Sequence, residues 1–251
     1  MEPSARSKRR EAAQERERID LSVVLPCYRG ARYLTHTLDR LDACLRHHSL
    51  SWEAIIVDDG GHDVDPSLTT RGGRVRLIQF HRNRGKGAAV RAGMLAAQGG
   101  VCAYTDVDLP YGEMPIVAAY SYIAQTGFHA VVGDRTLPDS KYASELGAGR
   151  RLLSSTFSAL VGRVVAPGYF DTQCGLKAFR GDIAKALYRL SRVDRFAQDL
   201  EIVYLLLVYR LDVKRIPLVL ESSTPTTLRI LRDSLRMLFD VVRVQGGRHM
   251  G

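Results

Sequence analysis

The sequence predicts an α/β fold in which one mostly parallel sheet carries helices on both faces. Short apolar segments rich in valine, isoleucine and leucine alternate along the chain with longer segments of helical periodicity. The apolar segments are nearly uninterrupted, as expected of strands that are buried on both faces of a sheet. The 251 residues contain no internal repeat and no Pro/Gly-rich linker, so we expect one large domain.

Four strands and two helices are expected in the first half of the chain. Pro26 ends the first apolar segment, and leucines recur at helical spacing in the segment that follows it. The segment 52–61 begins apolar and ends in acids and glycines, which predicts a strand followed by a turn. The expected elements are strand 21–26, helix 31–48, a strand within 52–61, strand 75–80, helix 86–97 and strand 101–108.

The second half of the chain is less regular. The elements expected there are strand 130–135, helix 149–165, a loop and strand within 171–180, a helix that opens at Gly181 and Asp182, helix 198–210 and edge strand 213–220. Residues 1–18 are polar and charged, which predicts a disordered arm before a domain of residues 19–225. Residues 226–251 combine arginines with an apolar stripe, which predicts a basic amphipathic helix that lies on an anionic membrane or packs on the core.

The chain is basic, with 36 Lys and Arg against 27 Asp and Glu, a net charge of +9. This excess predicts an anionic partner: a phosphorylated substrate, nucleic acid or a membrane surface. An aromatic content of 8% and acids gathered at strand ends argue against a nucleic-acid-binding module. The four cysteines are scattered, which argues against a zinc site or disulfides, and no apolar run is long enough for a membrane span. We therefore expect a cytoplasmic protein, peripheral at the cytoplasmic membrane face if its terminal helix binds lipid.

Acidic side chains gather at the ends of two predicted strands. Asp58 and Asp59 end one strand, and Asp106 and Asp108 end another. Because the carboxyl ends of parallel strands meet at one edge of a sheet, where ligands bind in such folds, we expect these acids to lie close together. At positions i and i+2 of an extended chain, Asp106 and Asp108 would reach one Mg²⁺ or Mn²⁺ that neutralises a diphosphate. A plain acidic turn is the alternative for either pair.

Six short segments follow one another along the chain in a recognisable order. They are SVVLPCYRGARYL, AIIVDDGG, HRNRGKGAAVRAGMLAAQG, YTDVDLP, GDR and DTQCGLKAFR. Together they resemble the inverting glycosyltransferases of family 2, which have the GT-A fold, and among these the dolichyl-phosphate and polyprenyl-phosphate glucosyl- and mannosyltransferases. The resemblance covers residues 20–245. It departs at Arg29 and Gly30, where relatives usually have Asn-Glu, so this segment does not indicate which nucleotide is bound.

The resemblance implies a metal-dependent hexosyltransferase that uses Mg²⁺ or Mn²⁺. Its donor would be a nucleotide-diphosphate sugar of the UDP-glucose or GDP-mannose type, and its acceptor a polyprenyl or dolichyl phosphate. The residues implied to bind the donor are Pro26, Tyr28, Asp58, Lys86, Asp106 and Asp108, of which Asp106 and Asp108 would also hold the metal. The residues implied to bind the acceptor are Arg135, Arg150, Arg151, Gln173 and Lys177. Residues 173–177, together with Asp199 and Glu201, would close the site around the sugar, and the implied catalytic residues are Asp199 and Arg135.

The nature of the acceptor determines whether the reaction needs a base. A phosphate acceptor is already an anion near pH 7, so it needs positioning and charge neutralisation, for which Arg135 and Lys177 are suited. A hydroxyl acceptor needs a base, and Asp199 is the candidate. The alternative function is therefore the same donor chemistry directed to a hydroxyl of a soluble small molecule or peptide in a secondary-metabolite pathway. An inactive nucleotide-sugar binder is disfavoured because Asp106, Asp108 and Asp199 are all present.

Overall fold

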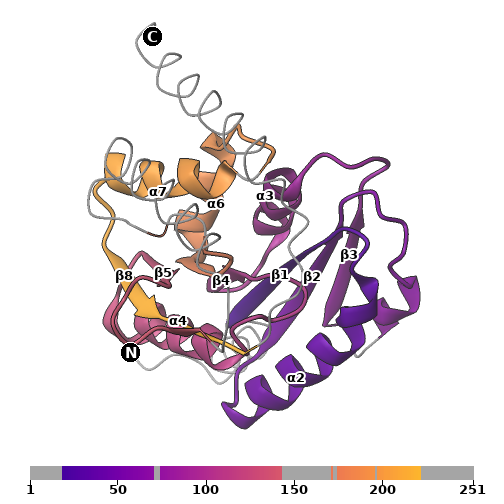
Figure 1. Cartoon of the computed structure of the whole chain (residues 1–251), viewed down its shortest axis with the longest axis horizontal. Coiled ribbons are helices and arrows are strands. Elements are labelled where there is room, and N and C mark those ends of the chain that lie inside the picture. Colours follow the sequence, from indigo (N-terminus) through magenta and orange to yellow (C-terminus); the bar gives the residue numbers. More distant parts are fainter. Residues whose placement is uncertain (1–18, 71–73, 143–170, 172–173, 196, 222–251) are drawn as a thin grey trace, which may run out of the picture.

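A computed structural model of the chain describes residues 19–70, 74–142, 171, 174–195 and 197–221 (Figure 1). Seven strands form one sheet in the order β3-β2-β1-β4-β7-β5-β8. Their bounds are β1 (Leu21–Cys27), β2 (Trp52–Asp58), β3 (Val75–Gln79), β4 (Val101–Tyr104), β5 (Ala130–Asp134), β7 (Lys177–Arg180) and β8 (Val213–Pro217). A second, two-stranded sheet pairs β6 (Lys141–Tyr142) with β9 (Val219–Leu220).

Helices cover both faces of the large sheet, as predicted (Figure 1). The helices are α2 (Leu34–His47), α3 (Lys86–Ala96), α4 (Met114–Thr126), α6 (Gly181–Leu190) and α7 (Gln198–Val208), with short 3₁₀ turns η1 (Ala31–Tyr33) and η2 (Pro66–Thr70). Alternate residues of β1 point to opposite faces: Val23 and Leu25 pack in the apolar cluster under α2 and α4. Val24 instead belongs to the cluster under α3, α6 and α7.

The sheet brings the ends of distant strands to one edge. All neighbouring pairs are parallel except the two that β7 makes, so the remaining strands place their carboxyl ends together. Strand β7 runs the opposite way between β4 and β5. Its first residue, Lys177, therefore lies at this same edge, level with Tyr104 of β4 and Val132 of β5. The edge that binds ligands in α/β folds is thus built from both halves of the chain.

One expectation about the acidic motif is wrong. Strand β4 ends at Tyr104, so Asp106 and Asp108 do not lie on one side of an extended chain. They belong instead to a turn in which the Leu109 amide donates to the Asp106 carbonyl oxygen at 3.0 Å. Leu109 adopts a left-handed φ of 46°, which closes the turn. The Thr37 hydroxyl of α2 donates to the Val107 carbonyl oxygen at 2.6 Å and anchors the turn.

The elements otherwise differ from expectation mainly at their ends. Strand β1 continues one residue beyond Pro26, and helix α6 opens at Gly181 as predicted. Helix α4 was not predicted, although Pro115 lies in its first turn and Gly127, with a φ of 80°, ends it. The predicted helix 149–165, the arm 1–18 and the terminal helix 226–251 lie outside the described residues. Among the helices that are described, none has the length and apolar character needed to span a bilayer.

Candidate active site

The beginning of α3 and the turn after β4 meet at the carboxyl edge of the sheet. Lys86, the first residue of α3, places its Nζ atom 2.5 Å from Oδ1 of Asp106. Burial alone would lower the pKa of Lys86, but the carboxylates of Asp106 and Asp199 raise it above its ordinary value. The ammonium therefore stays charged, and the pair stands at the point where the sequence predicts diphosphate and metal.

The carboxylate of Asp106 is enclosed on its other side by a glycine. A Cβ atom placed on Gly175 would overlap Oδ2 of Asp106, so residue 175 must lack a side chain for Asp106 to lie here. Asp108 follows in the same turn and is half-buried. Among the residues that the structure describes, no three His, Cys, Asp or Glu gather closely enough to form a complete metal site. Two carboxylates nevertheless fit Mg²⁺ or Mn²⁺, since Mg²⁺ usually takes one or two protein carboxylates and completes its shell with phosphate oxygens and water.

A second, buried ion pair lies behind the first. Lys177 of β7 is fully buried, and its Nζ atom donates to Oδ1 of Asp199 at 2.7 Å and to the Cys174 carbonyl oxygen at 2.8 Å. The Tyr104 hydroxyl donates to the same Oδ1 atom. Burial and the Asp199 charge raise the pKa of Tyr104 well above its ordinary value, so the phenol keeps its proton and remains a donor. Asp199 is thus held by two donors on one oxygen.

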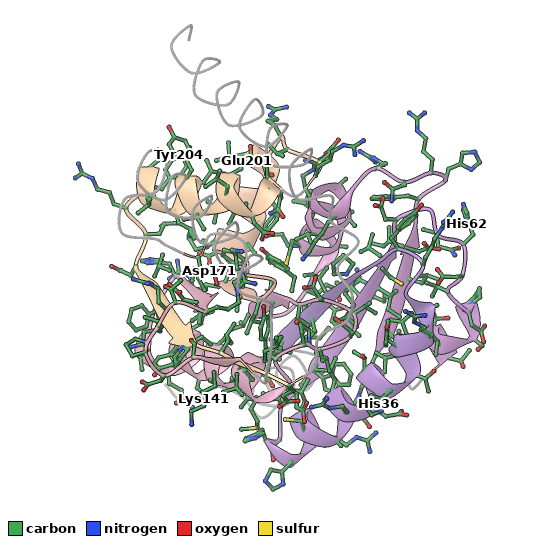
Figure 2. All side chains as sticks on the ribbon, in the orientation of Figure 1. His36, His62, Lys141, Asp171, Glu201 and Tyr204 are labelled. Carbon is green, nitrogen blue, oxygen red and sulfur yellow. The ribbon has the colours of Figure 1, made fainter. Side chains whose placement is uncertain are left out.

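The predicted acceptor-side residue Arg135 follows β5 and is held by Asp171. Its Nε and Nη2 atoms donate to the two carboxylate oxygens of Asp171 at 2.6 and 2.7 Å, and its backbone amide donates at 2.9 Å. Burial alone would raise the pKa of Asp171, but the hydrogen bonds and charge of Arg135 lower it. Asp171, labelled in Figure 2, is almost fully buried. The bidentate geometry fixes the guanidinium, which is about one quarter exposed.

The acids after β2 bind backbone amides of the loops at this edge. Asp58 is fully buried and accepts from the amides of Gly61 at 2.7 Å and His62 at 3.0 Å. Asp59 accepts from the amides of Arg84 at 2.7 Å and Gly85 at 2.9 Å, immediately before α3. Burial raises the pKa of Asp59, against the effect of these two hydrogen bonds. Both acids therefore hold the loops that surround the predicted donor site.

Tyr28 and Pro26, which are predicted to line the donor base, lie at the carboxyl end of β1. Pro26 is half-buried near the end of β1, and the Tyr28 ring just beyond it is about half exposed. The Arg29 guanidinium carbon lies 5.3 Å from the centre of this ring. An exposed aromatic face beside a cation is a suitable surface for a nucleobase.

Exposed arginines surround this edge of the sheet. Arg29 and Arg32 follow β1, Arg82 and Arg84 follow β3, and Arg195 precedes α7. Their loops touch, because Cβ atoms built on Gly61 and Gly85 would lie 2.8 Å from the Arg29 amide nitrogen and 3.0 Å from Arg195 Cγ. We call Arg29, Arg32, Arg82, Arg84 and Arg195 the arginine rim. Within the described part of the chain no member of the rim forms an ion pair within 4.0 Å, although the charge of Arg84 acts on Asp59.

Glu201 of α7, also predicted near the sugar, binds the loop that follows α6. Its carboxylate accepts from the Ser191 hydroxyl at 2.7 Å and from the amides of Arg192 at 2.9 Å and Val193 at 3.0 Å. Figure 2 shows Glu201 on α7. The same loop contacts the start of α3, where the Ala88 amide donates to the Asp194 carbonyl oxygen at 2.9 Å. Glu201 thus connects α7 to the helix that carries Lys86.

The structure brings most predicted site residues to one edge and adds others. Lys86 with Asp106 and Lys177 with Asp199 form its centre; Arg150, Arg151 and Gln173 lie outside the described residues. The residues that sequence reasoning missed are Tyr104, Tyr111 and Asp171. The charges of Asp106 and Asp171 both act on the buried Tyr111, which places it among these groups. In the sequence, Tyr111 is marked only by its position shortly after Asp108. A tyrosine in that position is equally well explained as a residue of the apolar core.

Comparisons with known proteins agree with this geometry. The dolichyl-phosphate beta-glucosyltransferase of Dictyostelium discoideum is 29% identical over 244 residues, covering 91% of this chain and 75% of that protein. The enzyme of the same name from Saccharomyces cerevisiae is 26% identical over 253 residues, covering 92% of this chain and 76% of that protein.

The crystal structure of glucosyl-3-phosphoglycerate synthase from Mycobacterium tuberculosis, in complex with Mn²⁺, UDP and glucosyl-3-phosphoglycerate, superimposes with a TM-score of 0.63. The superposition covers 96% of this chain and 86% of the synthase chain, and the two sequences are 16% identical. This likeness shows a shared GT-A fold. Residues 22–187 match the family described as "Glycosyl transferase family 2". Because this match spans most of the described sheet, the chain belongs to glycosyl transferase family 2 and is a glycosyltransferase.

Proposed function

We propose that this enzyme moves a hexose from a nucleotide-diphosphate sugar to a polyprenyl phosphate, with inversion at the anomeric carbon. The observation that carries the proposal is the meeting of the Asp106–Asp108 turn with Lys86 at the sheet edge, beside the exposed arginine rim. Both named relatives are dolichyl-phosphate glucosyltransferases, and they support this acceptor class.

On the donor side, the proposed contacts follow the edge from β1 to β4. The base stacks near Tyr28 and Pro26, with Asp58 ordering the adjoining loop. Asp106 and Asp108 hold Mg²⁺ or Mn²⁺, which neutralises charge on the leaving diphosphate when bound. The solved structure with Mn²⁺ and UDP on the same fold supports this assignment. Lys86 provides a further cation for the diphosphate.

On the acceptor side, the proposed phosphate contacts are Arg135, Arg150, Arg151, Gln173 and Lys177. Arg135 is already oriented by Asp171, which reduces the entropy lost when it binds an anion. Lys177 is fully buried, so it acts through its charge and by holding Asp199. Asp199 then serves to orient the cations at the edge, because a phosphate acceptor needs no base.

The proposed reaction is one in-line displacement. An oxygen of the acceptor phosphate attacks the anomeric carbon from the side opposite the diphosphate. A new carbon–oxygen bond forms as the bond to the diphosphate oxygen breaks, and the nucleoside diphosphate leaves with the electron pair. The cationic groups around the diphosphate stabilise the charge that develops on it. The terminal segment 226–251 is proposed to hold the enzyme at an anionic membrane, where the lipid phosphate is presented.

Transfer of radiolabel tests this function. Purified enzyme with Mn²⁺ and labelled UDP-glucose or GDP-mannose is expected to move label onto undecaprenyl phosphate and into the organic phase. Asp106→Asn and Asp108→Asn are expected to lower the rate by at least about 10²-fold, the cost of removing one transition-state contact. Asp42→Asn, which alters an exposed ion pair on α2, should leave the rate unchanged. Label that stays in the aqueous phase on a soluble hydroxyl compound would instead establish the alternative acceptor, with Asp199 as the base.

A further inference from the structure

Lys86 occupies a position that is unfavourable for a cation. It is the first residue of α3, and the positive end of the helix dipole disfavours a positive charge in the first turn. The first turn of α3 contains no acidic residue that would compensate for it. Asp106 supplies the missing negative charge from the turn after β4, with its Oδ1 atom 2.5 Å from Nζ. The placement of Lys86 therefore depends on an anion outside the helix.

The same carboxylate is the one that a divalent cation would use. Oδ2 of Asp106 lies against the backbone of Gly175, where even a Cβ atom would overlap it. Oδ1 is taken by the Lys86 ammonium, which is about one fifth exposed. A divalent cation at Asp106 would thus meet the positive charge of the Lys86 ammonium at Oδ1. Two cations repel at such distances, and the repulsion is strong where water is partly excluded.

We propose that Lys86 and the divalent cation compete for Asp106, and that the donor diphosphate relieves this competition by giving Lys86 a new anion. This inference rests on the proposed function, since it takes Asp106 and Asp108 as the metal ligands. The lysine side chain can make this exchange because four flexible carbons carry a compact charge. In the absence of nucleotide, Lys86 neutralises the charge of Asp106 and holds the cation affinity low.

Competition of this kind makes the binding of cation and nucleotide cooperative. A nucleoside diphosphate that draws Lys86 away raises the affinity for the cation, and the cation raises the affinity for the nucleotide by the same factor. Couplings between ligands are typically about 5- to 150-fold. Removing the lysine charge should therefore tighten binding of the cation alone and weaken the coupling.

Binding of Mn²⁺, followed through the electron paramagnetic resonance signal of the free ion, tests the inference without any measurement of activity. Wild type, Lys86→Met and Lys86→Arg are titrated with Mn²⁺ alone, then with saturating UDP or GDP. Without nucleotide, Lys86→Met is expected to bind Mn²⁺ about fivefold or more tighter than wild type. Lys86→Arg, which keeps the charge, should stay near wild type. Lys214→Met, on β8 near the opposite edge of the sheet, is the matched control for loss of one lysine.

The outcomes separate this inference from the proposed function. The competition is overturned if wild type and folded Lys86→Met bind Mn²⁺ with equal affinity. It is also overturned if nucleotide raises the Mn²⁺ affinity of both proteins by the same factor. Either result leaves the metal assignment intact. Wild type that binds no Mn²⁺ even with UDP or GDP overturns the metal assignment and the competition together. Thermal unfolding of each variant establishes that it is folded. If Lys86→Met is unfolded, Lys86→Gln replaces it in the same titrations.

Discussion

Gly175 sets the position of the Asp106 carboxylate because a side chain at residue 175 would occupy the same space. We expect Gly175→Ala to displace the carboxylate and to weaken Mn²⁺ binding in the presence of nucleotide by at least about tenfold, the effect typical of losing support for a metal ligand. Titration of the free Mn²⁺ signal measures this. Gly30→Ala is the control, since its Cβ atom would lie 3.1 Å from a Val107 methyl group that can move. Unchanged Mn²⁺ binding in Gly175→Ala would contradict the close approach.

The buried pair of Lys177 and Asp199 predicts a large and partly reversible effect on stability. Asp199→Asn leaves the fully buried Lys177 ammonium without its counter-charge, which typically costs about 3–5 kcal/mol of unfolding free energy. The double variant Asp199→Asn with Lys177→Met removes both charges and should recover part of this loss. Urea unfolding of the two single variants, the double variant and wild type measures the coupling. Losses that simply add would show that the two side chains do not interact.

At the scale of elements, α7 holds the loop that supports α3. Glu201→Gln replaces an oxygen acceptor with an amide donor that faces backbone N–H groups, so we expect it to lower the free energy of unfolding by about 1–3 kcal/mol. Thermal or urea unfolding measures the change. Glu113→Gln removes a half-exposed ion pair with Arg40 and should cost less than about 1 kcal/mol. A larger loss in Glu113→Gln than in Glu201→Gln would refute the role given to the Glu201 contacts.

The elements that could be predicted from sequence are those with a strong local pattern. The apolar runs of β1 and β2 and the Gly-Asp start of α6 are local signals, and each predicted an element that forms. The reversed direction of β7 could not be predicted, because strand direction depends on neighbours that are distant in sequence. Helix α4 was missed because Met114–Thr126 is apolar on most of its circumference and lacks amphipathic periodicity.

The chemistry of the site was easier to predict than its geometry. The positions of Asp106 and Asp58 near predicted strand ends indicated a ligand site. The turn at Leu109 could not be predicted, because it depends on a left-handed φ that leucine rarely adopts. The pairing of Lys86 with Asp106 and of Lys177 with Asp199 joins residues 20 and 22 positions apart. Such contacts follow from sheet topology and have no local signature.

At the scale of the whole molecule, buried thiols predict a loss of stability at alkaline pH. Burial raises the pKa of Cys27, Cys102 and Cys174 from the ordinary 9.0 to about 11. Between these values the unfolded chain has lost the thiol protons and the folded chain has kept them, so stability falls as pH rises from about 9 to 11. Each thiol contributes about 1.4 kcal/mol per pH unit in this range.

Urea unfolding between pH 8 and 11 tests this expectation. Cys102→Ala should lose less stability per pH unit than wild type, whatever its stability at pH 8, because one titrating group is gone. Cys44→Ala is a control at a thiol that is only half-buried. A pH slope that is the same in wild type and Cys102→Ala would contradict the assigned cause.

The buried lysine of β7 also has a consequence for how the protein is made. Synthesis proceeds from the amino terminus, so Lys177 leaves the ribosome before Asp199 does. Before α7 has been synthesised, inserting β7 between β4 and β5 would bury the Lys177 ammonium without its carboxylate partner, Asp199. We therefore expect the middle of the sheet to close only after α7 has been synthesised. We expect a chain truncated after α6 to leave the edge of β4 open to proteases.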